Sequence, residues 1–284
     1  MVTVRRGWAR ILSILFPDRC FGCGTYVRVN EDEFSNTPFP IFPKGFLESD
    51  LHLVFKESMK SLFCPECLET FKPVTAPFCI SCGALFSSRE GKNHWCGACL
   101  KNPPPYNRAR AAGLFEGSLM EAVHRFKYQE KTQFEKPLSA LLLFCLMIYA
   151  HEFAESGQSI DLVTPVPLHA KRFRERGFNQ AFLLIRNWEK MARLNHFALP
   201  FLSVDRQILV RNRYTSSQTG LKKAERKKNI HGAFGLSGKR AVRGKHILLV
   251  DDVYTTGATV NECARVLLKA GARRVDVLTL ARRV

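Results

Sequence analysis

ILLVDDVYTTGAT, at residues 247–259, places two acidic residues and a threonine-rich turn directly after a short apolar run. The run Ile247 to Val250 is continuously apolar, as expected for a central strand of a parallel sheet that is buried on both faces. Residues 260–270 continue with apolar side chains at helical spacing, and Gly271 ends that pattern. The segment therefore predicts a strand, a loop and a helix in succession.

The loop carries residues that suit a ribose phosphate. Asp251 and Asp252 are expected at the C-terminal end of the strand, where open α/β sheets bind ligands, and paired carboxylates accept hydrogen bonds from a vicinal diol. The residues behind them offer hydroxyl groups and close backbone approach: Thr255, Thr256, Gly257, Ala258 and Thr259. Their backbone N–H groups and the positive end of the next helix can surround a phosphate, whereas a simple helix cap needs only one threonine.

Two common phosphate-binding signatures are absent from the sequence. No Gly-Lys-Ser/Thr follows the turn, which argues against a nucleoside triphosphate clamp. No G-x-G-x-x-G occurs either, which argues against a dinucleotide site. The pattern therefore favours the phosphate group of a ribose 5-phosphate.

The remainder of the C-terminal two-thirds alternates in the same way. Strands are predicted over 110–115, 162–167, 208–210 and 275–280, and helices over 119–127, 138–153 and 179–194. Strands that alternate with helices indicate an α/β fold with a largely parallel central sheet.

Eight of the ten cysteines form four C-x-x-C pairs, a spacing typical of zinc knuckles. The pairs are Cys20 with Cys23, Cys64 with Cys67, Cys79 with Cys82 and Cys96 with Cys99. Two pairs complete a tetrahedral Zn(Cys)₄ site, so the sequence predicts two structural zinc ions in closed sites. Redox pairs of the thioredoxin type would need a βαβ context that is absent here. The two remaining cysteines lie in apolar predicted helices and are expected in the core.

An internal repeat bears on which pairs share a zinc ion. Glycine follows the first and third pairs, at Gly24 and Gly83, and leucine follows the second and fourth, at Leu68 and Leu100. This order favours two sequential zinc ribbons, the first with a long insertion at 25–63. An interleaved cross-brace is the alternative.

The segment Lys101-Asn102-Pro103-Pro104-Pro105 is stiff and non-helical, and it predicts a domain boundary. We expect an N-terminal helix with a double zinc-ribbon module at 1–105 and an α/β domain at 106–284. The formal net charge is +18, and residues 206–245 hold twelve basic side chains against one acidic side chain. Such a patch suits phosphates or nucleic acid, although a solvated face is the simpler alternative.

Nothing in the sequence predicts a membrane span. The most apolar run, Leu138 to Ala150, is shorter than the roughly 20 residues that cross a bilayer. The basic N-terminus leads into a short apolar stretch without a cleavage signal, which predicts an amphipathic helix rather than a signal peptide. Free C-x-x-C pairs also suit a reducing compartment, so we expect a cytoplasmic protein.

DDVYTTGAT resembles the phosphoribosyl pyrophosphate (PRPP) motif of type I phosphoribosyltransferases. The cysteine module, the helix containing Phe126-Lys127-Tyr128 and four further segments resemble the ComF family of competence proteins. These segments are PVPLHAKRFRERGFNQA at 165–181, R-x-R-x-T-x-x-Q at 211–218, ERKKNIHGAF at 225–234 and LTLAR at 278–282. The resemblance implies a type I phosphoribosyltransferase fold, with a parallel central sheet, preceded by a small Cys-rich double zinc-ribbon module.

The resemblance also implies roles for single residues. Asp251 and Asp252 would hold the ribose hydroxyls, with Asp252 stabilising charge that develops in transfer, and residues 255–259 would cradle the 5′-phosphate. The loop after the strand at 162–167 would meet the pyrophosphate through three cations: Lys171, Arg174 and Arg176. Mg²⁺ would be held mainly by oxygens of PRPP itself.

A segment at 211–228 matches the position of a flexible hood over such a site. Arg211, Arg213 and Gln218 could close on the ligand from there. Each of these side chains, taken alone, is equally well explained as a surface group.

Three functions follow from this reading of the sequence. The chain is an active phosphoribosyltransferase that displaces pyrophosphate from C1 of the ribose, or a protein of natural competence that binds single-stranded DNA, or a sensor that binds PRPP without chemistry. The ribbons and the basic patch would contact DNA, and other competence proteins are candidate partners. No acceptor base or general base is identifiable. We favour a phosphoribosyltransferase-like protein that acts in DNA uptake and binds both PRPP and single-stranded DNA.

Overall fold

The computed structural model describes most of the chain, in several ranges. These are residues 19–27, 51–88, 90–128, 132–153, 159–196, 198–199, 201, 203–215, 225, 229–237 and 242–283. The expected N-terminal amphipathic helix, residues 28–50 of the insertion and most of the second half of the hood lie outside them.

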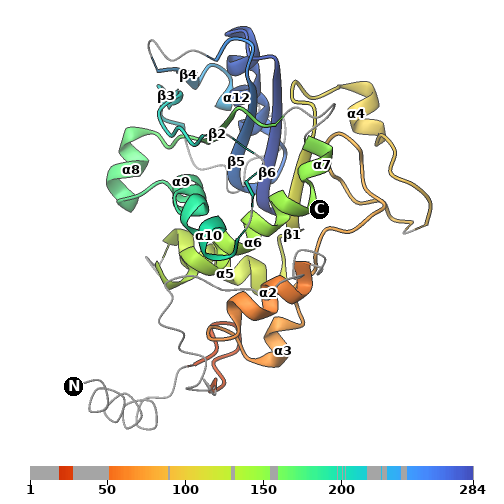
Figure 1. The fold of residues 1–284 in the computed structure, drawn as a ribbon, viewed down its shortest axis with the longest axis vertical. Helices are drawn as coiled ribbons and strands as arrows, with labels where there is room; N and C mark the ends of the chain where they lie inside the picture. The colour runs from red at the N-terminus through yellow and green to blue at the C-terminus, as the bar shows by residue number, and fades with distance from the viewer. Residues whose placement is uncertain are drawn as a thin grey trace.

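A fully parallel sheet of four strands forms the centre, in the order β1-β6-β5-β2 (Figure 1). Its strands are β1 (Ala109–Leu114), β2 (Leu162–Pro165), β5 (His246–Tyr254) and β6 (Arg274–Arg282). The parallel central sheet predicted from the sequence is confirmed. One detail differs, because β5 does not end at Val250: Asp251, Val253 and Tyr254 continue to pair with β6.

Helices cover both faces of the sheet, as the alternation of buried side chains along the strands requires. One face packs against α12 (Ala258–Lys269), and the other packs against α6 (Glu135–Ile148) and α9 (Gln180–Ile185). The α12 face of β5 presents Ile247 and Leu249, and the opposite face presents Leu248 and Val250. The continuous apolar run of β5 is therefore buried on both sides, as expected for a central parallel strand.

Two predicted helices are interrupted. The helix predicted over 138–153 is α6 followed by α7 (Ala150–Phe153), with a break at Tyr149. The helix predicted over 179–194 is α9 followed by α10 (Trp188–Leu194). At this second break, Arg186 makes a bidentate ion pair with the buried Glu135 at 2.8 and 2.7 Å, and Asn187 donates to the same carboxylate. These long-range contacts satisfy polar groups that a continuous helix would place elsewhere.

Smaller elements frame the ends of the sheet. They are α5 (Gly117–Tyr128), η3 (Thr132–Phe134), α8 (Ala170–Arg176) and an antiparallel pair of strands, β3 (Leu209–Arg211) with β4 (Phe234–Leu236). Within the described residues, no helix is both long and apolar enough to cross a bilayer.

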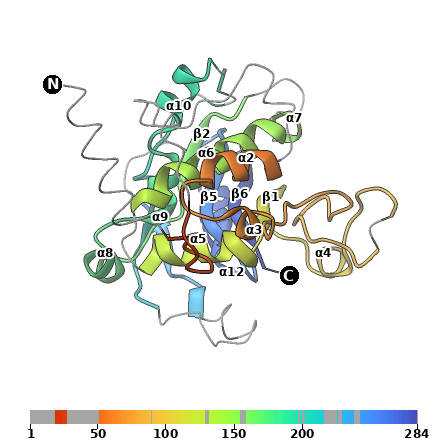
Figure 2. The same cartoon turned by 90° about the horizontal axis from the view of Figure 1, so that it is seen from below.

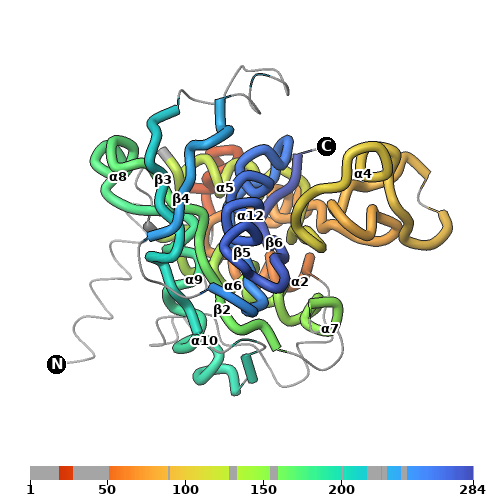
Figure 3. Tube along the Cα trace, turned by 90° about the horizontal axis from the view of Figure 1, so that it is seen from above, coloured from red at the N-terminus to blue at the C-terminus, as the bar shows by residue number. Residues whose placement is uncertain are grey.

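The N-terminal region divides into two parts. Helix α2 (Leu51–Met59) packs on α6, outside the layer that covers the sheet (Figure 2). Its Phe55 shares one hydrophobic cluster with Leu141 and Leu280 of the C-terminal region, so this cluster crosses the proposed boundary at residue 105. The segment around α4 (Gly97–Lys101) instead projects from the β1 side of the sheet, opposite α8 (Figure 3). The division at 105 stays a prediction.

Candidate functional site

A cleft of about 850 Å³ lies along the carboxyl edge of the parallel sheet. All four strands supply residues to it. Phe115 follows β1, Arg283 follows β6, Asp251 and Asp252 lie on β5, and Val166 follows β2. The edge where the sequence analysis placed the ligand is therefore a single continuous cavity.

The phosphate-binding turn, residues 255–259, begins where β5 ends. Gly257 precedes the first residue of α12 and has φ +75°, a left-handed conformation that favours glycine. A Cβ atom at this position would lie 2.4 Å from the Tyr254 hydroxyl, so only glycine fits here without movement. Of the five predicted residues, all except Thr256 line the cleft.

The two carboxylates occupy unequal environments. The backbone N–H of Asp252 donates to Asp251 Oδ1 at 2.9 Å, while Lys127 Nζ lies 2.8 Å from Asp252 Oδ2. Burial, together with the neighbouring charge of Asp252, raises the pKa of Asp251 to about 7. Lys127 from α5 opposes that shift, and its partnership with Asp252 was not inferred from the sequence.

The raised pKa of Asp251 predicts a pH-dependent stability. Its folded value, about 7, lies above the ordinary 3.8, so the native state holds a proton that the unfolded chain releases between those values. The free energy of unfolding should therefore fall as pH rises across this window, by up to about 1.4 kcal/mol per pH unit. Urea unfolding at pH 5 and pH 8 tests this against Asp251→Asn. A stability difference between wild type and variant that is equal at both pH values would contradict it, and Asp205→Asn serves as the control.

Cations line the β2 side of the cleft. Arg172 and Arg176 reach it from α8, and Arg211 reaches it from β3. The predicted Lys171 and Arg174 are exposed on α8 and do not line it, and Lys171 lies over the ring of Tyr214 at 4.7 Å.

Two donors on this side are buried and lack a hydrogen-bond partner among the described residues. They are Nε of Arg211 and Nε2 of Gln180, and both residues line the cleft. Buried donors without partners are costly, so an anionic ligand that accepted from them would be stabilised.

The β1 side of the cleft is aromatic and apolar. Met120, His124 and Lys127 lie on one face of α5, at spacings of four and three residues, and all three line the cleft. The ring of Phe115 lies 5.6 Å from that of His124. This end of the cleft therefore offers a flat, weakly polar surface instead of the cations found at the other.

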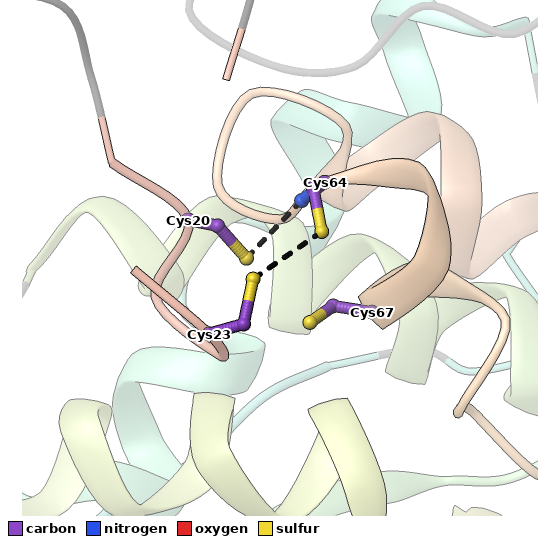
Figure 4. Close-up of side chains that lie close together, drawn as sticks. All are labelled: Cys20, Cys23, Cys64 and Cys67. Carbon is purple, nitrogen blue, oxygen red and sulfur yellow. Dashed lines mark hydrogen bonds between the residues drawn. The ribbon is translucent and has the colours of Figure 1, made fainter. Parts of the chain in front are cut away.

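The first cysteine cluster joins residues far apart in the sequence. The four Sγ atoms of Cys20, Cys23, Cys64 and Cys67 point toward one another and lie within 4.8 Å (Figure 4). Cys23 Sγ and Cys64 Sγ are 3.6 Å apart. Tetrahedral coordination with Zn–S bonds of about 2.3 Å gives sulfur–sulfur separations of roughly 3.8 Å, so these residues fit a zinc ion.

The second cluster repeats this arrangement with Cys79, Cys82, Cys96 and Cys99. Cys82 Sγ and Cys96 Sγ are 3.8 Å apart, which fits zinc equally well. His94 is not part of the group, and its ring stacks on Phe86 at 3.8 Å. The sequential pairing favoured by the internal repeat is therefore the one that the structure has.

The repeat extends to the backbone. Gly24 and Gly83 each donate to the carbonyl of the first cysteine of their pair at 2.9 Å, and both have positive φ. Leu68 and Leu100 each donate to the carbonyl of Cys64 or Cys96 at 3.0 Å. Each cluster thus consists of a glycine knuckle and a short helix that begins after a cysteine.

Comparisons with known proteins agree with this architecture. A family profile described as "Phosphoribosyl transferase domain" matches residues 192–284. "Competence protein F" of Haemophilus influenzae is 31% identical over 227 residues, which is 78% of this chain and 91% of the relative. "DNA utilization protein YhgH" of Escherichia coli is 35% identical over 188 residues, 66% of this chain and 77% of the relative.

The chain belongs to the ComF family. A more distant member, "Competence protein ComFC" of Bacillus subtilis, is 25% identical over 231 residues, 77% of this chain and 83% of the relative. The fold is that of a type I phosphoribosyltransferase, preceded by two Cys₄ clusters of the zinc-ribbon kind. A solved structure, the allosteric regulatory enzyme of purine biosynthesis, aligns over 46% of this chain and 24% of its own at 23% identity. Its TM-score of 0.26 is too low to support the assignment.

Other residues of this ComF-family chain occupy places that the sequence indicated only in part. Cys145 and Cys263 are buried in α6 and α12, as expected of core residues. Arg172 was not selected from the basic run, although its spacing of four from both Leu168 and Arg176 puts these three on one side of α8. That periodicity is the signal that could have identified it.

Proposed function

We propose that the chain binds PRPP with Mg²⁺ in the cleft and acts in natural competence. The observation that carries this proposal is the direct succession of Asp251, Asp252 and the phosphate-binding turn at the carboxyl end of the central strand. The carboxylates suit the ribose diol, and the turn with its N–H groups suits the 5′-phosphate.

The order of strands supports an orientation for the ligand. From β2 to β1, the cleft presents cations, then the carboxylates and the turn, then the aromatic surface. The pyrophosphate would lie toward Arg172, Arg176 and Arg211, where cationic donors neutralise its charge. Mg²⁺, bound chiefly by PRPP oxygens, would add charge neutralisation to the leaving group. An acceptor, if one is used, would approach from the side of Phe115 and His124.

Calorimetric titration with PRPP and Mg²⁺ tests the binding proposal. We expect the double variant Asp251→Asn/Asp252→Asn to lose at least tenfold in affinity, because two charged acceptors of the ribose hydroxyls become amides. Glu57→Gln, a change on the distant α2, is the matched control and should bind like the wild type. Binding that is equal in wild type and double variant would sink the proposal.

Transferase activity is the alternative to binding alone. It predicts release of pyrophosphate when PRPP is incubated with candidate bases, above the level of the double variant. PRPP binding without pyrophosphate release would identify a sensor.

We also propose that the second ribbon, residues 79–101, contacts single-stranded DNA. Trp95 and Leu100 are 42% and 66% exposed on this projecting segment, beside Lys92 and Lys101. Exposed aromatic and basic side chains are what sequence-tolerant binding of single strands uses. The names of the relatives, which refer to DNA utilization and competence, agree with such a role. Most of the basic patch at 206–245 lies outside the described residues.

The DNA proposal predicts that Trp95→Ala weakens binding of a fluorescent oligothymidine by roughly tenfold, because base stacking on one aromatic ring contributes about 1–3 kcal/mol. Affinity of the wild type should also fall steeply with salt. Fluorescence anisotropy measures both, with Leu53→Ala, an exposed apolar residue of α2, as the control. Salt-independent binding, or equal affinity of Trp95→Ala and wild type, would count against a ribbon contact.

A further inference from the structure

The second cysteine cluster is docked rigidly on the sheet. The backbone N–H of Ala109 in β1 donates to the Ser81 carbonyl at 2.7 Å, and the Arg110 guanidinium donates to the Ile80 carbonyl at 3.0 Å. A Cβ atom at Gly83 would lie 2.7 Å from the Ala109 carbonyl oxygen, which shows how closely the knuckle approaches the strand. A change in this knuckle is therefore felt by the sheet.

Arg282, at the end of β6, connects the knuckle to the phosphate site. Its Nη1 donates to the carbonyl of Cys82, and its Nη2 lies 3.9 Å from Cys82 Sγ. The same guanidinium lies over the ring of Tyr254, 4.8 Å from the centroid, and Tyr254 is the residue that pairs with Arg282 in the sheet. Arg282 is 9% exposed, so these contacts are largely shielded from solvent.

Tyr254 in turn supports the phosphate-binding turn. Gly257 is seated against the phenol so closely that a Cβ atom would lie 2.4 Å from the hydroxyl. That hydroxyl is held at 2.8 Å by the hydroxyl of Tyr106, which follows directly on the proline segment leaving the second ribbon. Two connections from the ribbon, one through Arg282 and one through Tyr106, therefore meet beneath Gly257.

We propose that Arg282 and Tyr254 are positioning residues that hold the phosphate-binding turn in the geometry set by the second cysteine cluster. Metal occupancy of this cluster and phosphate binding are then coupled. The four cysteines fit zinc, and a metal-bound thiolate at Cys82 keeps the charge that the Arg282 guanidinium faces. The proposal rests on the proposed PRPP site for its meaning, but the coupling itself can be tested without PRPP.

Hydrogen exchange of the full-length, zinc-loaded protein measures the coupling directly. Cys96→Ser removes a ligand of the second cluster that does not touch Arg282. We expect amides of residues 255–259 to exchange roughly five to ten times faster in this variant, within the usual range of coupling between sites. The β2 peptide at 162–165 should not change. Arg282→Gln should reproduce the effect, Arg282→Lys should lessen it, and Cys96→Ser should add little in the Arg282→Gln background.

A first-cluster variant supplies the matched control. Cys23→Ser also removes a zinc ligand, and any acceleration there should be spread over β2 as well as the turn. Unchanged exchange at 255–259 in Cys96→Ser would overturn the coupling, as would independent, additive effects of Cys96→Ser and Arg282→Gln.

Zinc release gives a second readout, useful if Cys96→Ser does not fold. Coupling is reciprocal, so PRPP with Mg²⁺ should slow the release of one of the two zinc ions to a chromogenic chelator several-fold. Arg282→Gln should abolish the difference. Equal release with and without PRPP, under conditions where calorimetry shows binding, would overturn the coupling. Absence of PRPP binding would instead refute the proposed function, and hydrogen exchange would still decide the coupling.

Discussion

Replacing Gly257 with alanine is expected to weaken PRPP binding by on the order of a hundredfold, because displacing a binding group by about 1 Å can cost this much. The added Cβ would lie 2.4 Å from the hydroxyl of Tyr254 and 2.8 Å from its Cζ. Tyr254 cannot easily yield, since Tyr106 and Arg282 hold it. The turn itself must therefore move away from the phosphate position.

Backbone strain must be separated from this collision. An alanine at φ +75° costs roughly 1–2 kcal/mol of stability wherever it is placed. Gly244→Ala is the matched control, because Gly244 has φ +73° and a Cβ atom there meets nothing within 4 Å. Calorimetry should find both variants destabilised to a similar extent, but only Gly257→Ala impaired in binding.

A second substitution sharpens the test. Tyr254→Phe removes the hydroxyl that lies nearest to the new Cβ, so it should restore part of the affinity lost in Gly257→Ala. If Gly257→Ala binds PRPP as well as Gly244→Ala does, the turn does not hold the phosphate in the way proposed.

The success of the sequence analysis at this site has a physical reason. The strand, the carboxylates and the turn are contiguous, and their chemistry depends on neighbours within a few residues. The cysteine pairing was favoured for a similar reason, since Gly24 and Gly83 repeat a local backbone requirement that the sequence itself displays. Local constraints of this kind leave a pattern that needs no tertiary information.

The contacts that were not foreseen are all long-range. Lys127 meets Asp252 because α5 is placed beside β5, and nothing in the sequence spacing fixes that approach. The choice of Arg172 over Lys171 depends on how α8 is rotated toward the cleft. Helix α2 lies within the insertion that had no interpretation, and its place on α6 follows from packing of apolar faces, which the pattern of one helix alone cannot assign.

Loss of a zinc ligand should have very different consequences in the two clusters. The first cluster is part of the main core, where Cys20 and Cys64 pack in the same hydrophobic cluster as Phe63 and Phe134. The second cluster forms a small separate cluster of its own. Cys64→Ser should therefore destabilise the whole domain, whereas Cys96→Ser should loosen the projecting ribbon and leave the main core folded.

The attachment of the first knuckle explains why the damage should spread. The Phe21 carbonyl accepts from Arg125 of α5 at 2.9 Å, and the Phe21 ring packs edge-on against Phe134 at 5.2 Å. Structural zinc sites contribute roughly 10–16 kcal/mol of apparent binding free energy, so losing even a part of this exceeds the effect of most point substitutions.

Calorimetric melting with zinc analysis tests the contrast. Both variants should retain one zinc ion in place of two. Cys64→Ser should lower the main transition by on the order of 10 °C, since about 1 kcal/mol corresponds to roughly 2–4 °C in a domain of this size. Cys96→Ser should shift it by only a few degrees, because the ribbon adds little buried surface to the main core. Equal shifts in the two variants would mean that both clusters stabilise one cooperative unit, and that the projecting ribbon is not the independent element its packing indicates.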